Sequence, residues 1–181
     1  MAAVIAAPAS GSGKTLLSLA LLSWAHQNGR RIQPFKVGPD YLDAQLLSQA
    51  SGQACRNLDL NLCGEDWVRR AFHGYGGVAD LTLVEGVMGL FDGIGSSETG
   101  STADVARLLG LPVVLVLDAG GQAASLGALV RGFRDHDPNL AIAGVVLNKV
   151  SSPRHRELLA EVLERMEVPL LGCLPRSEVL A

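Results

Sequence analysis

The fold is decided by the stretch AAVIAAPASGSGKTLLSLALLSWA, residues 2–25. Its first part, AAVIAAP, is an apolar run typical of a buried strand, and KTLLSLALLSWA has the composition of an apolar helix that ends near Gly29. The residues SGSG between them carry no bulky side chain, so backbone N–H groups and the helix N-terminus can together approach an anion. This stretch therefore predicts a strand, a phosphate-binding loop and a helix.

The segment PASGSGKT, residues 8–15, matches the phosphate-loop pattern G-x-x-x-x-G-K-[ST] except at its first position, which is Pro8. That position mainly leads the chain out of the strand and need not donate an N–H, so a proline is compatible with the loop. We expect Lys14 to reach the β- and γ-phosphates and the Thr15 hydroxyl to bind Mg²⁺. The alternative, an ordinary strand–helix turn, leaves SGSGKT unexplained. The expected nucleotide-binding residues are Ser10, Gly11, Ser12, Gly13, Lys14 and Thr15.

Composition and charge narrow the class of protein. The 181 residues suffice for one domain with a substantial core, and 48% hydrophobic and 18% charged residues are typical of a compact α/β protein. The net charge is −3 and no basic cluster occurs, which argues against nucleic acid as a partner. Residues 1–7 are too short for a signal peptide, and proline, aspartate and glycine interrupt the apolar run 108–130. We therefore expect no membrane span.

Short apolar runs alternate with longer helical patterns along the chain. Runs such as LPVVLVLD and AIAGVVLN are apolar throughout, as strands covered on both faces are. We predict an α/β fold with a doubly wound, mostly parallel sheet whose ligands bind beyond the carboxyl ends of the strands. The expected strands are 2–7, 31–37, 80–85, 112–118, 141–147 and 169–173, and the expected helices are 13–28, 41–50, 65–73, 102–110, 121–135 and 154–166.

Two carboxylates end predicted strands. Glu85 ends DLTLVEG beside Gly86, at the position where nucleotide-binding folds orient Mg²⁺. A solvated loop carboxylate is the alternative for Glu85. Asp118 ends VVLVLDAG in the same way, and it can equally cap the helix that follows. We expect Glu85 to serve the metal and leave Asp118 open between ligand and cap.

The segment PFKVGPDYLD, residues 34–43, closes the second strand and opens a helix. A lysine, two acids and a tyrosine surround its rigid Gly-Pro turn, an arrangement suited to positioning a substrate and a metal. The alternative is an ordinary helix start with Asp40 as the N-cap. The candidate residues are Lys36, Asp40, Tyr41 and Asp43.

Three further polar residues at this edge of the sheet have two interpretations each. Ser101 or Thr102 begins a helix in GSTADVARLL, and capping explains them as well as ligand binding does. Asn148 ends AGVVLNK, where it could contact an adenine edge, but a strand-end turn explains it equally well.

Seven segments, taken in order along nearly the whole chain, carry a family resemblance: APASGSGKT, QPFKVGPDYLD, RNLD, LVEGVMGLFDG, GSTADVARLLGLPVVLVLDA, AGVVLNKV and LGCLPR. Together they resemble the N-terminal synthetase domain of the cobyrinate a,c-diamide synthases, in the dethiobiotin-synthetase-like group of P-loop NTPase-like proteins. FKVGPDYLD with VEGVMGLFDG is highly specific, whereas the phosphate loop alone is not.

The resemblance implies ATP-dependent amidation of the a and c carboxylates of cobyrinic or hydrogenobyrinic acid during cobalamin biosynthesis. A carboxylate is a poor electrophile, so ATP first converts it to an acyl phosphate, which ammonia can attack. Positioning and charge neutralisation supply most of the catalysis for such a transfer. The resemblance assigns Asn148 to the base and Thr15, Asp40 and Glu85 to Mg²⁺. Lys36, Asp40, Tyr41 and Asp43 would orient the γ-phosphate and the corrin carboxylate.

Members of the family continue into a glutaminase domain, which has a cysteine nucleophile on a glycine-flanked elbow and a histidine partner. No cysteine of this sequence has such an elbow, so we expect residues 1–181 to be a single synthetase domain without the glutaminase domain. Such a chain would use free ammonia and not glutamine. The cysteines are odd in number and lack C-x-x-C spacing, which indicates no disulfide framework or zinc site and favours the cytoplasm. They are Cys55, Cys63 and Cys173.

Two other functions compete with this interpretation. A dethiobiotin-synthetase-like carboxylase shares the ATP site, but GPDYLD matches the corrin enzymes better. A non-catalytic nucleotide-binding module, including a MinD-like ATPase, would usually carry a lysine where this chain has Ala9. The sequence leaves open whether the corrin carries cobalt and whether the chain forms a homodimer.

Overall fold

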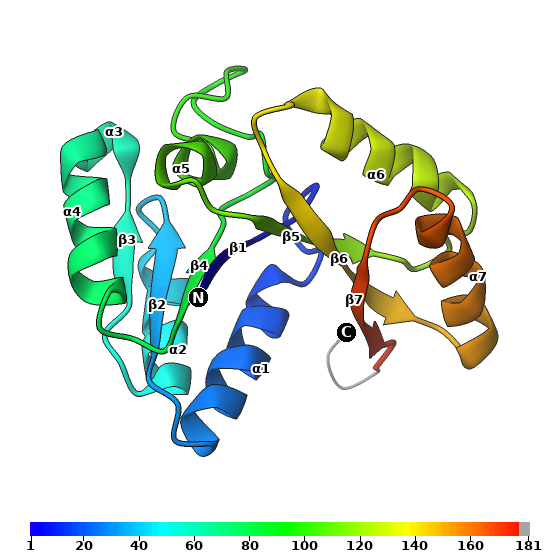
Figure 1. Ribbon diagram of the computed structural model, residues 1–181, viewed down its shortest axis with the longest axis horizontal. Helices are drawn as coiled ribbons and strands as arrows, with labels where there is room; N and C mark the ends of the chain where they lie inside the picture. Colours follow the sequence, from blue (N-terminus) through cyan, green and yellow to red (C-terminus); the bar gives the residue numbers. More distant parts are fainter. Residues whose placement is uncertain (178–181) are drawn as a thin grey trace.

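The strands of this protein form one parallel sheet with helices on both faces in the computed structural model, which describes residues 1–177 (Figure 1). Residues 178–181 of the expected single domain lie outside the described part. The strands are β1 (Ala2–Ala6), β2 (Ile32–Val37), β3 (Arg56–Leu58), β4 (Leu81–Glu85), β5 (Val113–Asp118), β6 (Ile142–Val150) and β7 (Leu170–Pro175). The helices are α1 (Lys14–Gln27), α2 (Tyr41–Ser51), α3 (Leu60–Cys63), α4 (Glu65–Gly76), α5 (Thr102–Leu109), α6 (Ser125–His136) and α7 (Pro153–Glu164).

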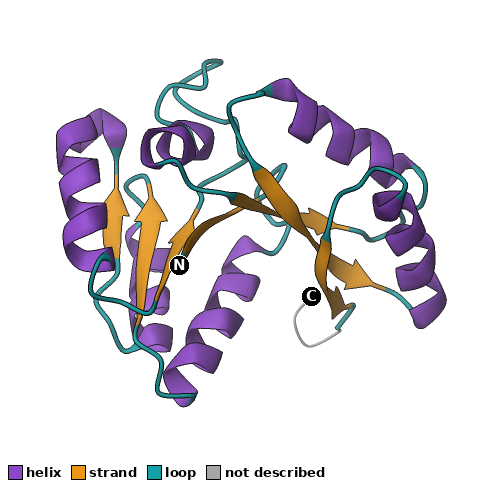
Figure 2. Ribbon diagram, in the orientation of Figure 1, coloured by secondary structure: helices purple, strands orange, loops and turns teal. Residues whose placement is uncertain are grey.

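The strand order is β3-β2-β4-β1-β5-β6-β7. The chain runs from the central β1 to one side, returns in β4 and continues to the other side, which confirms the predicted doubly wound α/β fold. This reversal places the topological switch point at β1, and the phosphate-loop segment follows β1 directly. Loops gather at the carboxyl ends of the strands, including the long segment 86–101 between β4 and α5 (Figure 2).

Two apolar cores, one on each face of the sheet, hold the layers together. In the larger core, α4, α5, α6 and α7 pack against strand residues such as Val84 and Leu115. In the smaller core, α1 and α2 pack through Leu22 and Leu47 against the other face, which includes Ile5. Burial of these side chains is the main favourable contribution to folding. No helix formed by residues 1–177 is long and apolar enough to cross a membrane.

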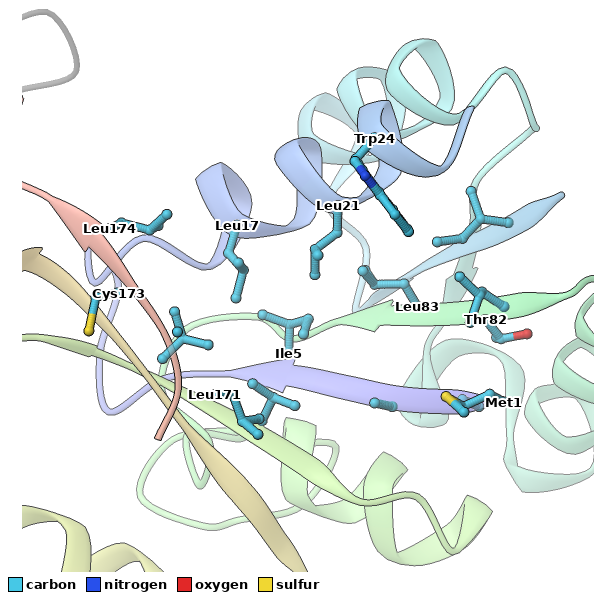
Figure 3. A pocket seen from close by; sticks show the side chains of 17 residues that line it. Met1, Ile5, Leu17, Leu21, Trp24, Thr82, Leu83, Leu171, Cys173 and Leu174 are labelled. Atoms are coloured by element: carbon cyan, nitrogen blue, oxygen red, sulfur yellow. The ribbon is translucent and has the colours of Figure 1, made fainter. Parts of the chain in front are cut away.

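An apolar groove of 430 Å³ lies open on the α1 face of the sheet (Figure 3). Leu17, Leu21 and Trp24 of α1 form one wall, and Leu171 of β7 belongs to the other. Trp24 is 57% exposed and Leu171 is 52% exposed. The first residues of β1 and β4 also line the groove, so it lies toward the amino ends of the strands. It is therefore separate from the edge at which ligands of such sheets bind.

The structure differs from the expected elements in several places, among them the end of α4, which lies at Gly76 and not at residue 73. The sequence analysis does not predict β3 and α3, because segments of 3 and 4 residues are too short to show a periodic pattern. β6 ends at residue 150, beyond its expected end at 147, so Asn148 lies within the strand. The helix expected from residue 121 begins at Ser125. The residues before it form a turn, in which Gly121 has φ 70° and Gln122 donates to the Asp118 carbonyl.

Candidate active site

The phosphate-loop segment enters α1 at Gly13, and this helix start has no side-chain cap. Gly13 has φ 109°, in the left-handed region that favours glycine. The Ser12 hydroxyl donates to the Ala9 carbonyl at 2.9 Å, which closes the loop on itself. By contrast, Ser101 caps α5 by accepting a hydrogen bond from the Asp104 N–H, so capping is its role. The first turn of α1 keeps backbone N–H donors for an anion.

Lys14, the first residue of α1, reaches back over the loop. Its side chain is 7% exposed, and its ammonium donates to the Met88 carbonyl at 2.6 Å and to the Ala9 carbonyl at 3.4 Å. Burial lowers the pKa of Lys14 below its usual value, and the nearby charge of Lys36 lowers it further. Met88 has φ 49°, which is costly for a residue other than glycine and occurs where the surroundings hold it. A phosphate would offer Lys14 a charged acceptor in place of two carbonyls.

Lys36 and Glu85 occupy paired positions on the neighbouring strands β2 and β4, so their side chains share one face of the sheet. The Lys36 ammonium lies 2.8 Å from Glu85 Oε1 and 2.7 Å from Asp43 Oδ2. Lys36 is 2% exposed and Glu85 is 0% exposed, so the solvated carboxylate considered for Glu85 is wrong. Burial by itself lowers the pKa of Lys36, but the Glu85 and Asp43 carboxylates raise it above its usual value. The β2 and β4 ends and Asp43 of α2 thus form a charge cluster, defined here as Lys36, Asp43 and Glu85, in which Lys36 and Glu85 are buried and the Asp43 side chain is 25% exposed.

The turn after β2 holds this cluster in place. Asp40 Oδ1 caps α2 by accepting from the Asp43 N–H at 3.0 Å, and Asp40 Oδ2 lies 3.9 Å from the Lys36 ammonium. Burial raises the pKa of Asp43, but the hydrogen bond from Lys36 and its charge lower it below the usual value. Asn57 of β3 donates to the Asp40 carbonyl at 3.1 Å, which fixes the turn. Tyr41 is 75% exposed, so the structure does not bring its ring into the charge cluster.

A magnesium ion fits the oxygen atoms between the loop and the cluster. The Thr15 hydroxyl donates to Glu85 Oε1 at 2.8 Å, which brings two oxygen ligands together. Glu85 Oε2 is buried and has no hydrogen-bond partner among residues 1–177, a costly state for a carboxylate oxygen. Mg²⁺ is commonly held by one or two protein oxygens together with phosphate oxygens and waters. Within the described chain no group of three His, Cys, Asp or Glu side chains is suited to a metal, so a bound phosphate would have to share the coordination.

The ends of β5 and β6 flank the other side of the loop with a neutral amide and a surface ion pair. Asn148 is 6% exposed and donates from Nδ2 to the Ser12 carbonyl at 3.0 Å. Asp118, the paired residue of β5, lies 2.6 Å from the Lys149 ammonium. Burial raises the pKa of Asp118, but hydrogen bonds from Lys149 and from a backbone N–H lower it below the usual value. Asp118 does not cap α6, whose N-cap residue is Ala124.

A cavity of 420 Å³ adjoins this second side of the loop. Leu16 of α1 contributes apolar surface, and Asp118, Asn148 and Lys149 contribute polar groups. The residues that follow β7 close the cavity. Its mixed lining is typical of a small-molecule pocket at the carboxyl edge of an α/β sheet.

The segment that follows β4 makes contacts that its residue types do not predict. A Cβ atom on Gly86 would lie 2.7 Å from the Thr102 side chain, so a larger residue has no space there. The Thr102 hydroxyl accepts a hydrogen bond from the Val87 N–H at 3.0 Å. This bond ties α5 to the segment after β4 and does not cap a helix. The carbonyls of Gly86 and Met88 accept hydrogen bonds from Lys36 and Lys14. These acceptors are backbone atoms, so side-chain types give no signal for them.

A parallel sheet whose central strand leads through a glycine-containing turn into an uncapped helix defines the class of phosphate-loop nucleotide-binding proteins. The chain belongs to the CbiA family, described as the CobQ/CobB/MinD/ParA nucleotide binding domain, whose model matches residues 3–181. It is 47% identical over 182 residues to a cobyrinate a,c-diamide synthase from Gloeobacter violaceus, with 100% of this chain and 40% of the relative covered. It is 51% identical over 176 residues to a hydrogenobyrinate a,c-diamide synthase from Streptomyces coelicolor, with 96% of this chain and 36% of the relative covered.

Solved structures support the fold independently of sequence. Chloroplast FtsY from Physcomitrella patens has a TM-score of 0.64 at 17% identity, covering 94% of this chain and 57% of that chain. A nucleotide-binding protein from Archaeoglobus fulgidus, solved in complex with ADP, has a TM-score of 0.59 at 14% identity, covering 99% of this chain and 83% of that chain. At such identities the likeness shows a shared fold. The chain spans about 40% of the length of the Gloeobacter relative, so the activity of the longer proteins concerns more than this region.

Proposed function

We propose that this chain is the ATP-dependent synthetase part of a cobyrinate or hydrogenobyrinate a,c-diamide synthase. The two relatives with these names described above align over 100% and 96% of the chain. The observation that carries the proposal is the buried ion pair of Lys36 and Glu85, joined by the partly exposed Asp43, beside an uncapped phosphate loop. Buried charges are costly, and a loop that binds phosphate does not by itself need them. They suit a site that activates a second charged group, the carboxylate.

In this proposal ATP lies along the carboxyl edge with its phosphates at the loop. Backbone N–H groups of 10–13 and the N-terminus of α1 would bind phosphate oxygens, and Lys14 would exchange its carbonyl partners for the β- and γ-phosphates. The base would enter the 420 Å³ cavity, where Asn148 lies in the wall. The carboxyl edge of the sheet from β2 to β6 would then bind the nucleotide and the substrate.

Thr15 and Glu85 would hold Mg²⁺ through the hydroxyl oxygen and Glu85 Oε2. When bound, the ion neutralises charge on the β- and γ-phosphate oxygens. Asp40 is kept as the third proposed ligand. Because its Oδ1 already caps α2, its Oδ2 is the oxygen open to a metal.

The reaction itself needs two displacements. A carboxylate oxygen of the corrin substrate attacks the γ-phosphorus, the bond to ADP breaks, and an acyl phosphate forms. Ammonia then attacks the carbonyl carbon and inorganic phosphate leaves. Lys36 would orient the γ-phosphate and the attacking carboxylate, with Asp40 and Asp43 fixing its position and the exposed Tyr41 meeting the corrin. Charges fixed before the substrate arrives lower the barrier without reorganisation.

Ammonia is the proposed nitrogen donor for this region, and a glutaminase domain that releases it from glutamine is the proposed partner. Burial raises the pKa of Cys55 to about 12, and the Glu85 carboxylate adds to the shift, so its thiol is not a nucleophile at neutral pH. Glutamine hydrolysis requires a cysteine activated by an adjacent base. None of the three cysteines lies on a glycine-flanked elbow in the sequence either, so the proposed donor for this region is ammonia and not glutamine.

The test is product formation by the purified chain. Cobyrinic or hydrogenobyrinic acid is incubated with ATP, Mg²⁺ and either ammonium or glutamine, and the diamide and ADP are followed by mass spectrometry. We expect diamide with ammonium and none with glutamine. An active glutaminase domain, added in trans, supplies whatever the second domain contributes to the corrin site. Absence of both diamide and ADP under all these conditions contradicts the proposal, and diamide from glutamine alone contradicts the assignment of the donor.

A further inference from the structure

Asn148 is held on both ends of its side-chain amide. Its Nδ2 donates to the Ser12 carbonyl at 3.0 Å, and its Oδ1 accepts from the Lys149 N–H at 2.9 Å. The residue is 6% exposed, so little of the amide is open to a ligand. Lys149 has φ 57°, a conformation costly for a residue other than glycine. The end of β6 is thus built around a fixed amide.

The phosphate loop meets this amide with its backbone. A Cβ atom on Gly13 would lie 2.4 Å from Asn148 Nδ2, so no side chain fits between the loop and the amide. Ser12 is anchored twice, by its carbonyl to Asn148 and by its hydroxyl to the Ala9 carbonyl at 2.9 Å. The two bonds fix the peptide between Ser12 and Gly13 in one orientation.

We infer that Asn148 is a positioning residue of the phosphate loop and serves the nucleotide through Ser12, in place of the contact to the base expected from the sequence. In a trans peptide the C=O and N–H groups point in opposite directions. When Asn148 holds the Ser12 carbonyl on the β6 side, the Gly13 N–H faces away from β6 and is free to donate to a phosphate. The inference rests on the proposed nucleotide site. It states that Asn148 affects the binding of the phosphates and not of the base.

The amide chemistry makes this role specific to asparagine. An aspartate of the same shape has no N–H at neutral pH, and its carboxylate oxygen would face the Ser12 carbonyl oxygen. Asn148→Asp therefore replaces attraction with repulsion at unchanged size. Asn148→Ala removes the bond without repulsion and leaves the Ser12 carbonyl unpaired.

The experiment separates phosphate from base by using two probes. Calorimetry measures the affinity of ATP and of inorganic triphosphate, each with Mg²⁺, for the wild type, Asn148→Asp and Asn148→Ala. Asn28→Asp is the matched control, because Asn28 also donates from Nδ2 to a backbone carbonyl, that of Trp24 at 2.7 Å, at the far end of α1. We expect the affinities for both probes to fall by the same factor, on the order of tenfold for Asn148→Asp and less for Asn148→Ala. The control should bind as the wild type does.

Three results would overturn the inference. If the Asn148 variants lower the affinity for ATP but not for triphosphate, Asn148 contacts the base. Unchanged affinity for both probes gives it no role in the site. Equal weakening in Asn28→Asp shows a general loss of structure. Should Asn148→Asp fail to fold, judged by thermal unfolding, Asn148→Ala decides between these results. A wild type that binds neither probe contradicts the proposed nucleotide site itself, a failure separate from that of the variants.

Discussion

The phosphate loop lies between two unlike groups of side chains. On the β2–β4 side, Lys36 and Glu85 are buried at 2% and 0% exposure and form an ion pair at 2.8 Å. On the β5–β6 side, the ion pair between Lys149 and Asp118 is 45% and 38% exposed, and the buried residue is the neutral Asn148. Taking an ion pair out of water costs several kcal/mol per ion, roughly, whereas a surface pair costs little and contributes little. The buried ion pair on the β2–β4 side supports the proposal that the carboxylate is activated there, while the β5–β6 side is the proposed place of the base.

Lys14 belongs to the loop between the two sides, and its removal has the largest expected effect on nucleotide binding. Lys14→Met should lower the affinity for ATP by about 100-fold, since charge-assisted hydrogen bonds worth roughly 3 kcal/mol are lost. The folded-state pKa of Lys14 is lowered mainly by burial, so the folded protein holds this proton less tightly than the unfolded chain. The positive charge is therefore destabilising at neutral pH, and the variant should unfold at a higher temperature than the wild type without nucleotide.

Calorimetry and thermal unfolding test both halves of this prediction. Arg165→Met is the control, since it removes a cation that is 77% exposed at the end of α7 and does not line the 420 Å³ cavity. Equal ATP affinities of Lys14→Met and the wild type contradict the assignment of the loop.

The second largest effect is expected from Glu85→Gln, because it removes one charge of the buried Lys36–Glu85 ion pair and leaves the β5–β6 side unchanged. Loss of turnover of at least about 100-fold is expected, since Glu85 Oε2, which has no hydrogen-bond partner among residues 1–177, is the oxygen proposed to bind Mg²⁺. The variant also leaves Lys36 buried with one partner fewer, which should cost about 3 kcal/mol of unfolding free energy. Because Glu85 is fully buried, a loss of stability should accompany the loss of activity. Diamide formation and urea denaturation measure the two effects.

The double variant Lys36→Met with Glu85→Gln separates them. It should recover part of the lost stability, because the buried Lys36 charge is gone and only the partly exposed Asp43 loses its partner, and it should recover none of the activity. Full activity of Glu85→Gln refutes its role, and an additive loss of stability in the double variant refutes the coupling.

The sequence predicts the fold well because its strongest patterns are long. The apolar strand, the small-residue turn and the apolar helix of residues 2–25 each extend over several residues, and the parallel order follows from strand–helix alternation. The polar residues at strand ends, Lys36 and Glu85, could also be selected as candidates from sequence. Their depth could not, since burial depends on α2 and the segment after β4, which pack over them. Short elements such as β3 carry no periodicity and were missed for that reason.

Backbone contacts escape sequence analysis for a different reason. The carbonyls of Met88 and Ser12 accept hydrogen bonds from Lys14 and Asn148 whatever their side chains are. The sequence shows Asn148 as a polar strand end and a candidate base contact, but which atom its amide bonds depends on the path of a loop 136 residues earlier. A prediction from residue types finds such residues and leaves their partners open.

The acid dependence of stability offers a third comparison. The pKa of Asp43 is below its usual value in the folded state, because the hydrogen bond from Lys36 and its charge outweigh burial. Asp43 therefore contributes stability that is present above its unfolded pKa of about 3.9 and is lost as the pH falls through the folded value. Asp43→Asn should flatten the fall of the urea midpoint below about pH 4. Asp66→Asn, on the exposed face of α4, is the control, and an equal flattening in both variants contradicts the prediction.

The smallest effect is expected from Asp118→Asn on the β5–β6 side. Asp118 and Lys149 lie 2.6 Å apart, yet they are 38% and 45% exposed, so water screens the pair and competes for both groups. We expect a loss of unfolding free energy below about 1 kcal/mol, measured by urea denaturation in low salt. In about 1 M salt, where the screening length falls to roughly 3 Å, the difference from the wild type should become smaller still. The loss in Glu85→Gln should persist in the same salt, because its ion pair is shielded from solvent. A loss of about 3 kcal/mol in Asp118→Asn, or a loss that salt does not reduce, would make the two ion pairs energetically alike. The charge buried near β4 would then be no longer a mark of the reacting side, and the assignment of carboxylate activation to that side would lose its physical basis.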